Sequence, residues 1–177
     1  MEAPDEELML AYRGGDAGAF ETLYARHRGP LYRFILRGAA DRALAEELYQ
    51  DVWMRVIEAR GRYAPQAKFT TWLYTIAHNR LVDHWRRKGL SVVAVENEEI
   101  PSGAADPARA LEGRRALERF AAALEALPLA QREAFLLHEE AGLSVAEIAA
   151  ATGTNEEAAK SRLRYATAKL KAALNNE

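Results

Sequence analysis

Residues 142–174, "GLSVAEIAAATGTNEEAAKSRLRYATAKLKAAL", combine a short helical pattern, a turn that contains a glycine, and a longer helical pattern rich in basic residues. Ser144 and Glu147 have the spacing of a capping box, so the first helix is expected to begin after Ser144. Gly153 supplies the backbone freedom that ends this helix. Thr154 and Glu157 repeat the capping-box spacing and are expected to start the second helix. The segment therefore predicts a helix-turn-helix unit.

The second helix of this unit has an apolar face and a basic face. The apolar residues recur every three or four positions and are expected to be buried: Ala159, Leu163, Ala166, Leu170 and Ala173. The opposite face carries Lys160, Ser161, Arg164 and Ala168, flanked by Arg162, Tyr165 and Lys169. A basic exposed face is what major-groove insertion and phosphate neutralisation require. A merely solvated amphipathic helix is the simpler alternative, but the capping boxes and the glycine turn favour DNA reading.

A second informative stretch is "KFTTWLYTIAHNRLVDHWRRK", residues 68–88, which has the pattern of one unbroken helix. Its broad apolar stripe is assigned to the core: Phe69, Trp72, Leu73, Ile76, Ala77, Leu81 and Trp85. Hydrogen-bonding and planar groups lie elsewhere and lead into a basic end: Tyr74, His78, Asn79, Asp83, Arg86 and Arg87. Unpaired bases stack on rings and are read along their edges, so this combination suits single-stranded nucleic acid. His78 and His84 lack the spacing of four that brings two ligands together on a helix, so no metal site is expected.

The composition is that of an ordinary globular protein. Hydrophobic residues make up 49% of the 177 residues and charged residues 28%. No apolar run is long enough to span a bilayer, and the N-terminus "MEAPDEE" is acidic where a signal peptide is basic. We therefore expect a cytoplasmic protein with no membrane insertion of its own. The net charge of −2 argues against coating nucleic acid by bulk electrostatics, and the lack of cysteine excludes disulfides and thiol switches.

The periodicity along the chain predicts the all-α class, because almost every segment has a helical pattern and none alternates as a sheet does. The expected helices are residues 5–13, 16–38 with a disturbance at Gly29–Pro30, 41–60, 69–88, 111–127 and 129–141, followed by the helix-turn-helix unit. Residues 89–113 break the pattern with Pro101, Gly103 and Pro107 among small and acidic residues, and are expected to be a linker. The "SVVAV" run within it is interpreted as extended linker rather than strand. This organisation predicts two domains, at about residues 1–88 and 114–177.

Taken in order, these stretches resemble the extracytoplasmic-function (ECF) group of the bacterial sigma-70 family of sigma factors. The likeness covers almost the whole chain. "GDAGAFETLYARHRGPLYRF" is similar to the family's opening helices, "AEELYQDVWMRV" to its second conserved stretch, and "FTTWLYTIAHNRLVDHWRR" to its promoter-melting helix. "LPLAQREAFLLHEEAGLSVAEIAAATGTNEEAAKSRLRYATAKL" is similar to its C-terminal helix-turn-helix domain. The resemblance implies a dissociable subunit that binds core RNA polymerase, directs it to promoters and promotes opening of the −10 element.

The resemblance also implies how the melted −10 element is bound. In the family, the loop before the melting helix holds a base flipped from the non-template strand, which places this role on residues 62–68 with Tyr63 as a stacking group. Asn79 matches an asparagine that is frequent in the family. The implied −10 contacts are Tyr63, Lys68, Trp72, Tyr74, His78, Asn79, Asp83, Arg86 and Arg87.

The second conserved stretch docks, in the family, on a coiled coil of the largest polymerase subunit. In this chain its polar face carries Glu47, Gln50, Asp51, Met54 and Glu58, opposite an apolar side of Leu44, Leu48, Val52 and Val56. An acidic face with a methionine suits a basic helical partner. A merely solvated face is the alternative.

The family's recognition helix reads the −35 duplex. Its motif maps onto Lys160, Ser161, Arg162, Arg164 and Tyr165. The chain departs from the family's frequent Pro and Val-Gly-Thr, since Asn155 and then Glu-Glu-Ala stand there, so no promoter sequence can be carried over. The acidic linker residues Glu96, Glu98 and Glu99 resemble the connector that threads the polymerase cleft.

The sequence contains no Gly-rich phosphate loop, no paired nucleophile and base, and no metal-ligand cluster, so we expect neither enzymatic activity nor a cofactor. The implied partners are core RNA polymerase, promoter DNA as −35 duplex and melted −10 strand, and an anti-sigma factor. Two alternatives belong to other classes. An operator-binding helix-turn-helix regulator leaves the helix at 69–88 unexplained, and a sigma-like decoy for an anti-sigma factor has no need of the basic DNA-reading face.

Overall fold

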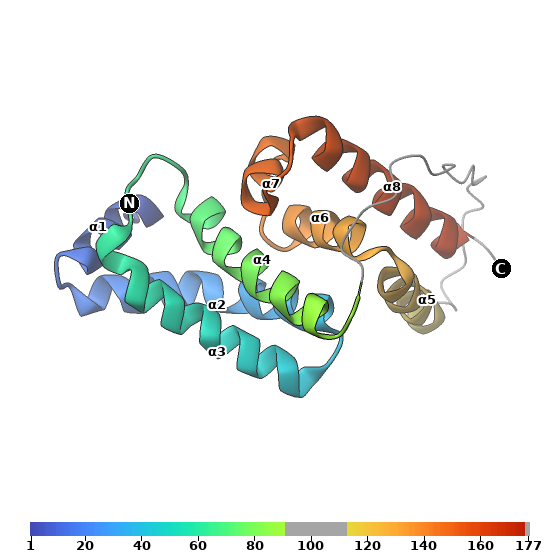
Figure 1. Ribbon diagram of the computed structural model, residues 1–177, viewed down its shortest axis with the longest axis horizontal. Helices are drawn as coiled ribbons and strands as arrows, with labels where there is room; N and C mark the ends of the chain where they lie inside the picture. The colour runs from blue at the N-terminus through green and yellow to red at the C-terminus, as the bar shows by residue number, and fades with distance from the viewer. Residues whose placement is uncertain (91–112, 176–177) are drawn as a thin grey trace.

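The computed structural model describes residues 1–90 and 113–175 (Figure 1). Its elements are α1 (Asp5–Arg13), α2 (Ala17–Ala39), α3 (Arg42–Ala59), the 3-10 turn η1 (Arg60–Arg62), α4 (Phe69–Arg87), α5 (Gly113–Ala126), α6 (Leu129–Glu139), α7 (Val145–Thr152) and α8 (Glu156–Asn175). These ranges contain no strand, and the expected all-α class with two helical domains is confirmed. None of the helices described is long and apolar enough to cross a membrane. The "SVVAV" run and Glu96, Glu98 and Glu99 lie outside the described residues.

Local sequence signals set several helix starts in the N-terminal domain, α1–α4. The Asp16 carboxylate accepts two backbone N–H groups from the first turn of α2, and the Asp41 carboxylate accepts the Leu44 N–H at 3.1 Å to cap α3. α2 continues through Pro30, so the expected disturbance at Gly29–Pro30 does not end the helix. Packing of α2 against both α3 and α4 outweighs the local cost of an internal proline.

The core of this domain forms where α4 crosses α2. Five residues of the predicted α4 stripe are buried: Phe69, Leu73, Ala77, Leu81 and Trp85. The crossing is close at Gly38, because a Cβ atom there would lie 2.9 Å from the Leu81 Cδ1 atom. The buried Trp85 indole N–H donates to the Gly38 carbonyl oxygen at 3.1 Å. The two remaining stripe residues, Trp72 and Ile76, are half-buried.

In the C-terminal domain, α5–α8, α6 lies centrally and contacts α7, α8 and also α2 of the other domain. The α6 residues Gln131, Arg132 and Glu133 are polar yet buried. Arg132 donates through Nη2 to the carbonyl oxygens of Glu125 at 2.5 Å and Leu127 at 3.4 Å. Arg132 therefore satisfies carbonyl groups at the end of α5 and just beyond it.

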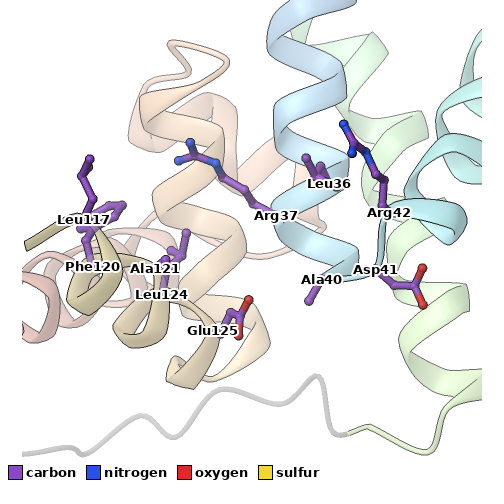
Figure 2. A pocket seen from close by; sticks show the side chains of 10 residues that line it. All are labelled: Leu36, Arg37, Ala40, Asp41, Arg42, Leu117, Phe120, Ala121, Leu124 and Glu125. Atoms are coloured by element: carbon purple, nitrogen blue, oxygen red, sulfur yellow. The ribbon is translucent and has the colours of Figure 1, made fainter. Parts of the chain in front are cut away.

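The two domains lie against each other, with α4 on α7 and α2 on α6 (Figure 1). Beside this contact, a cavity of about 480 Å³ separates the end of α2 from α5 (Figure 2). Leu36 and Arg37 line it from α2, and Leu117 and Phe120 line it from α5. Leu117 is 71% exposed, so apolar packing between the domains is incomplete at this end.

Candidate nucleic-acid and polymerase interfaces

The helix-turn-helix unit is present as α7, a turn and α8. The Glu147 N–H donates to Ser144 Oγ at 3.2 Å, and the Ser144 N–H donates to Glu147 Oε1 at 3.3 Å. Gly153 ends α7 with a φ of +67°, in the left-handed region that glycine adopts without strain. The expected capping box and glycine turn are therefore confirmed.

The cap of α8 differs from the expectation. Asn155 Oδ1 accepts the Ala158 N–H at 2.8 Å, so Asn155 is the N-cap, and the prediction of a capping box at Thr154 and Glu157 was wrong. The Thr154 N–H instead donates to the Ala149 carbonyl oxygen at 3.0 Å. Thr154 thus completes the end of α7, and the next residue starts α8.

The outer surface of α8 carries the basic residues predicted to contact DNA. Lys160 and Arg164 are exposed, and Ser161 and Arg162 are half-buried. Tyr165 is buried, with the Arg164 guanidinium 5.5 Å from the centroid of its ring. A tyrosine in this position supports the arginine above it and does not itself extend into solvent.

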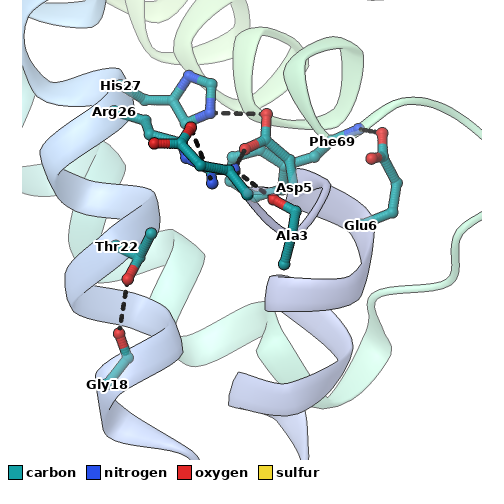
Figure 3. Close-up of polar contacts among 9 residues, drawn as sticks. Ala3, Asp5, Glu6, Gly18, Thr22, Arg26, His27 and Phe69 are labelled. Atoms are coloured by element: carbon teal, nitrogen blue, oxygen red, sulfur yellow. Dashed lines mark hydrogen bonds and ion pairs between the residues drawn. The ribbon is translucent and has the colours of Figure 1, made fainter.

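The start of α4 is held by α1. Lys68, at the N-cap position, makes no side-chain hydrogen bond to the helix. Glu6 of α1 takes this role, because its Oε1 accepts the Phe69 N–H at 3.0 Å (Figure 3). Arg13 of α1 donates through Nη1 to the Tyr63 carbonyl oxygen at 2.9 Å. Both ends of the loop at residues 63–68 are thus tied to α1.

α1 is anchored in turn by Asp5 (Figure 3). Its carboxylate lies 2.8 Å from His27 Nε2 and accepts from Arg26 Nη1 at 3.1 Å. Burial raises the pKa of Asp5, but the hydrogen bonds and charges of His27 and Arg26 outweigh it and lower the pKa below its ordinary value of 3.8. Sequence reasoning missed Glu6, Arg13 and Asp5 because no local motif marks them.

The aromatic residues of the predicted −10 site pack together at the start of α4. The Tyr63 ring is fully buried, edge-on to Trp72 with ring centroids 5.2 Å apart and 6.3 Å from that of Phe69. Burial raises the pKa of the Tyr63 hydroxyl. Trp72 keeps part of its ring exposed, and Lys68 is exposed. Of these rings, Trp72 rather than Tyr63 has a surface that a base can reach in this arrangement.

Two predicted −10 residues in the middle of α4 are covered, one by α2 and the other by the C-terminal domain. Tyr74, which the sequence placed outside the core, is 1% exposed and packs edge-on against Phe34. His78 Nδ1 lies 2.5 Å from Glu133 Oε1 of α6. The helix pattern was misleading here because α4 is packed on two sides, by α2 and by α6 and α7.

The C-terminal half of α4 presents the remaining predicted residues to solvent. Asn79, Asp83, Arg86 and Arg87 are all exposed. Their spacing of three and four residues places them on one continuous face. Asp83 accepts from Arg80 Nη1 at 3.1 Å, which leaves the two terminal arginines as the cationic end of this face.

The predicted polymerase-binding face of α3 is exposed and continuous. Glu47, Gln50, Met54 and Glu58 are exposed, with Met54 at 52%. Asp51 is partly buried and forms ion pairs with Arg80 of α4 and, at 3.4 Å, with Arg55. The apolar side behaves as expected: Leu48, Val52 and Val56 are buried and Leu44 is half-buried.

Comparisons with known proteins agree with this geometry. Residues 23–90 match the sigma-70 region 2 family, and residues 117–170 match the sigma-70 region 4 family. The chain is 36% identical over 165 residues to the RNA polymerase sigma factor CarQ of Myxococcus xanthus, covering 92% of this chain and 93% of CarQ. It is 31% identical over 169 residues to the ECF RNA polymerase sigma factor SigM of Mycobacterium tuberculosis, covering 96% of this chain and 84% of SigM.

A solved structure shares the fold. The sigma factor RpoE of Bartonella quintana, crystallised with the anti-sigma factor NepR, superposes with a TM-score of 0.69 at 28% identity, over 88% of this chain and 96% of RpoE. The region 2 match covers most of α2 and all of α3 and α4, and an operator-binding regulator leaves α4 unexplained. The chain therefore belongs to the ECF group of the sigma-70 family and is an RNA polymerase sigma factor.

Proposed function

We propose that the two promoter elements are read by two separate surfaces of this sigma factor. α8 enters the major groove of the −35 duplex, where Lys160, Ser161, Arg162 and Arg164 contact DNA and Tyr165 supports Arg164. The single observation that carries this proposal is the exposed basic face of α8 on a capped helix-turn-helix unit. Lysine and arginine on such a face neutralise phosphates, and a recognition helix offers its side chains to base edges.

The second surface is α4, which we assign to the non-template strand of the melted −10 element. Its exposed face of Asn79, Asp83, Arg86 and Arg87 supplies polar groups for base edges and cations for the backbone. Trp72 and Lys68 extend this face toward the loop at residues 63–68. His78 completes the set once α6 no longer covers it. Tyr74 supports this face from its packing against Phe34 of α2, and Tyr63 serves as the buried support of Trp72.

The face of α3 is assigned to core RNA polymerase. Glu47, Gln50 and Glu58 provide an acidic and polar surface around the exposed Met54, which complements a basic helical partner. The ion pair between Asp51 and Arg80 fixes the position of this face relative to α4. Residues 1–88 thus combine core binding with −10 binding, residues 114–177 bind the −35 element, and residues 89–113 connect them.

In this assignment the protein works in the cytoplasm, where bacterial polymerase and chromosome meet, and nucleotide joining belongs to the core enzyme. RpoE of Bartonella quintana was crystallised with the anti-sigma factor NepR. By analogy we infer that an anti-sigma factor also holds this chain inactive. With no cysteine in the sequence, any redox signal must be sensed by that partner.

The test is transcription on fragmented host DNA with core RNA polymerase and nucleotides, with and without the protein, followed by sequencing of RNA 5′ ends. The expected result is a set of new starts that share paired motifs at −35 and −10. Tight duplex binding by the protein alone, without new starts, would instead support an operator-binding regulator. A decoy for an anti-sigma factor would give neither.

A further inference from the structure

Two acidic residues open the recognition helix α8, and neither takes part in its cap. Asn155 Oδ1 accepts the Ala158 N–H at 2.8 Å and caps α8, so Glu157 does not form the capping box that its spacing with Thr154 predicted. Glu156 and Glu157 are exposed, and neither carboxylate has a hydrogen bond or ion pair with any part of the chain that the structure describes. Their presence at the start of a DNA-reading helix therefore needs another explanation.

The helix dipole explains an acidic first turn only in part. A negative charge near a helix N-terminus stabilises the helix, and this effect applies to Glu156 and Glu157 alike because both lie in the first turn of α8. A carboxylate on a face that contacts DNA also repels phosphates, which opposes binding. An acidic residue on that face therefore favours binding only where it meets a hydrogen-bond donor, and duplex DNA has such donors on its bases.

The two carboxylates differ in their position around the axis of α8. Each residue of an α-helix turns by about 100°, so Glu157 lies about 20° from Arg164 and about 60° from Lys160. Both of these cations are exposed, so Glu157 falls within the basic face. Glu156 lies about 80° from Arg164 but only about 20° from Leu163, which is half-buried. Glu157 therefore belongs to the DNA-reading face, whereas Glu156 lies toward the packed side of the helix.

Glu157 also lies at the end of α8 that a recognition helix brings to the bases. In helix-turn-helix proteins the N-terminal residues of the second helix contact base edges in the major groove. The region 4 match spans residues 117–170 and so includes this turn. Lys160 and Arg164 lie further along the same face, and their charges offset the repulsion between Glu157 and phosphates. The carboxylate is thus placed to accept from a base while its neighbours bind the backbone.

The chemistry of the major groove limits which base can donate to a carboxylate. Guanine presents two acceptors there, and thymine presents an acceptor and a methyl group. Adenine presents a donor beside an acceptor, and that acceptor repels a carboxylate. Cytosine presents a donor, its N4 amino group, with no acceptor on the same edge. A carboxylate in the position of Glu157 therefore favours cytosine over the other three bases.

We propose that Glu157 is a specificity-determining residue of this sigma factor and accepts a hydrogen bond from the N4 amino group of a cytosine in the −35 element. This inference rests on the proposed role of α8 in −35 binding and adds the base that one position requires. Arg164 lies about 10 Å further along the helix axis, or roughly three base-pair steps, so its own base contact is at a separate position. Selection of the cytosine therefore does not depend on Arg164.

The test compares Glu157→Ala with Glu156→Ala in the full chain bound to core RNA polymerase. Both substitutions remove one negative charge from the first turn of α8, so they change the interaction with the helix dipole alike. The template is a promoter found by start mapping, with each position of its −35 element randomised in turn. A barcode in the transcribed region links each RNA to the −35 sequence that directed it, and circular dichroism checks that each variant keeps its helix content.

We expect the natural protein to prefer cytosine at one −35 position by roughly ten-fold over the other bases. Glu157→Ala should reduce this preference to about two-fold or less, because no acceptor remains to discriminate the amino group. Base preferences at the other −35 positions should be unchanged, and Glu156→Ala should keep the natural preference at every position. Titration with −35 duplexes that differ only at the selected base pair should show the same loss in binding.

A cytosine preference that persists in Glu157→Ala would overturn the inference. An equal loss in Glu156→Ala would also overturn it, because the start of the helix rather than a base contact would then explain the effect. A natural −35 element without a selected cytosine, or a lost preference for a different base, would do the same. In each of these cases transcription still starts at promoters and the sigma activity stands. If start mapping yields no promoters, the failure lies in the proposed function, and the inference falls with it.

Discussion

Replacing Glu6 by alanine is expected to lower the free energy of unfolding of the N-terminal domain by about 1.5 kcal/mol. The first turn of α4 receives no side-chain cap from Lys68, and Glu6 Oε1 accepts the Phe69 N–H at 3.0 Å instead. Loss of an N-cap acceptor costs about 1 kcal/mol. Loss of a negative charge near a helix N-terminus costs about 0.5 kcal/mol more.

Two matched variants separate these contributions. Glu6→Gln keeps an oxygen that can accept the Phe69 N–H but removes the charge, so it should lose only about 0.5 kcal/mol. Glu7→Ala removes an exposed carboxylate from the same first turn of α1. It reports what loss of an acidic residue does to α1 alone.

Urea unfolding followed by tryptophan fluorescence is a suitable assay. All three tryptophans, Trp53, Trp72 and Trp85, lie in the N-terminal domain, so the signal reports that domain. The expected order of stability is natural protein, then Glu6→Gln, then Glu6→Ala, with Glu7→Ala above Glu6→Ala. If Glu6→Ala and Glu7→Ala lose equal free energies of unfolding, Glu6 does not cap α4, which begins 63 residues later in the sequence.

Three further outcomes are expected. Arg164→Ala should weaken binding to the −35 duplex about ten-fold and lower the number of counterions released on binding by about one, while binding to core polymerase is kept. An unchanged affinity for the duplex in a titration would show that Arg164 does not contact DNA. Asp51→Arg should impair co-elution with core polymerase, and so should Glu47→Arg, which does not place a second cation beside Arg80. Normal co-elution of both variants would count against polymerase binding by the α3 face. Asp5→Asn should lower the free energy of unfolding at pH 7, and its difference from the natural protein should shrink as the pH falls below about 4, because an Asp5 pKa lowered in the folded state gives stability only while the carboxylate is ionised. A difference in urea titrations that is as large at pH 3 as at pH 7 would contradict this assignment.

Local chemistry made much of the fold predictable from the sequence. The carboxylates of Asp16 and Asp41 cap α2 and α3, and Ser144 with Glu147 opens α7. Each of these signals acts within one turn of helix, so spacing alone reveals it. Asn155 was missed as the cap of α8 because Thr154 offers an equally good local spacing, and only the path of the turn decides between them.

Contacts between distant helices could not be predicted in this way. Helical periodicity states which residues share a face but not how many neighbours a helix has. Tyr74 and Tyr165 were placed outside the core for this reason, and both are buried. The cap from Glu6 to Phe69 joins α1 to α4 and has no local signature. The predicted −10 surface is consequently smaller in the structure than the sequence indicated, because α2 packs on Tyr74 and α6 covers His78.

The polar run in α6 explains how one helix can serve both domains. Gln131 and Glu133 are two positions apart, so they lie on nearly opposite sides of a helix with 3.6 residues per turn. Gln131 accepts from Lys169 of α8 at 3.2 Å, whereas Glu133 meets His78 of α4. The first contact lies within the C-terminal domain, and the second joins it to the N-terminal domain. Because the two contacts use different side chains on different faces of α6, the support of α8 does not depend on the contact with α4.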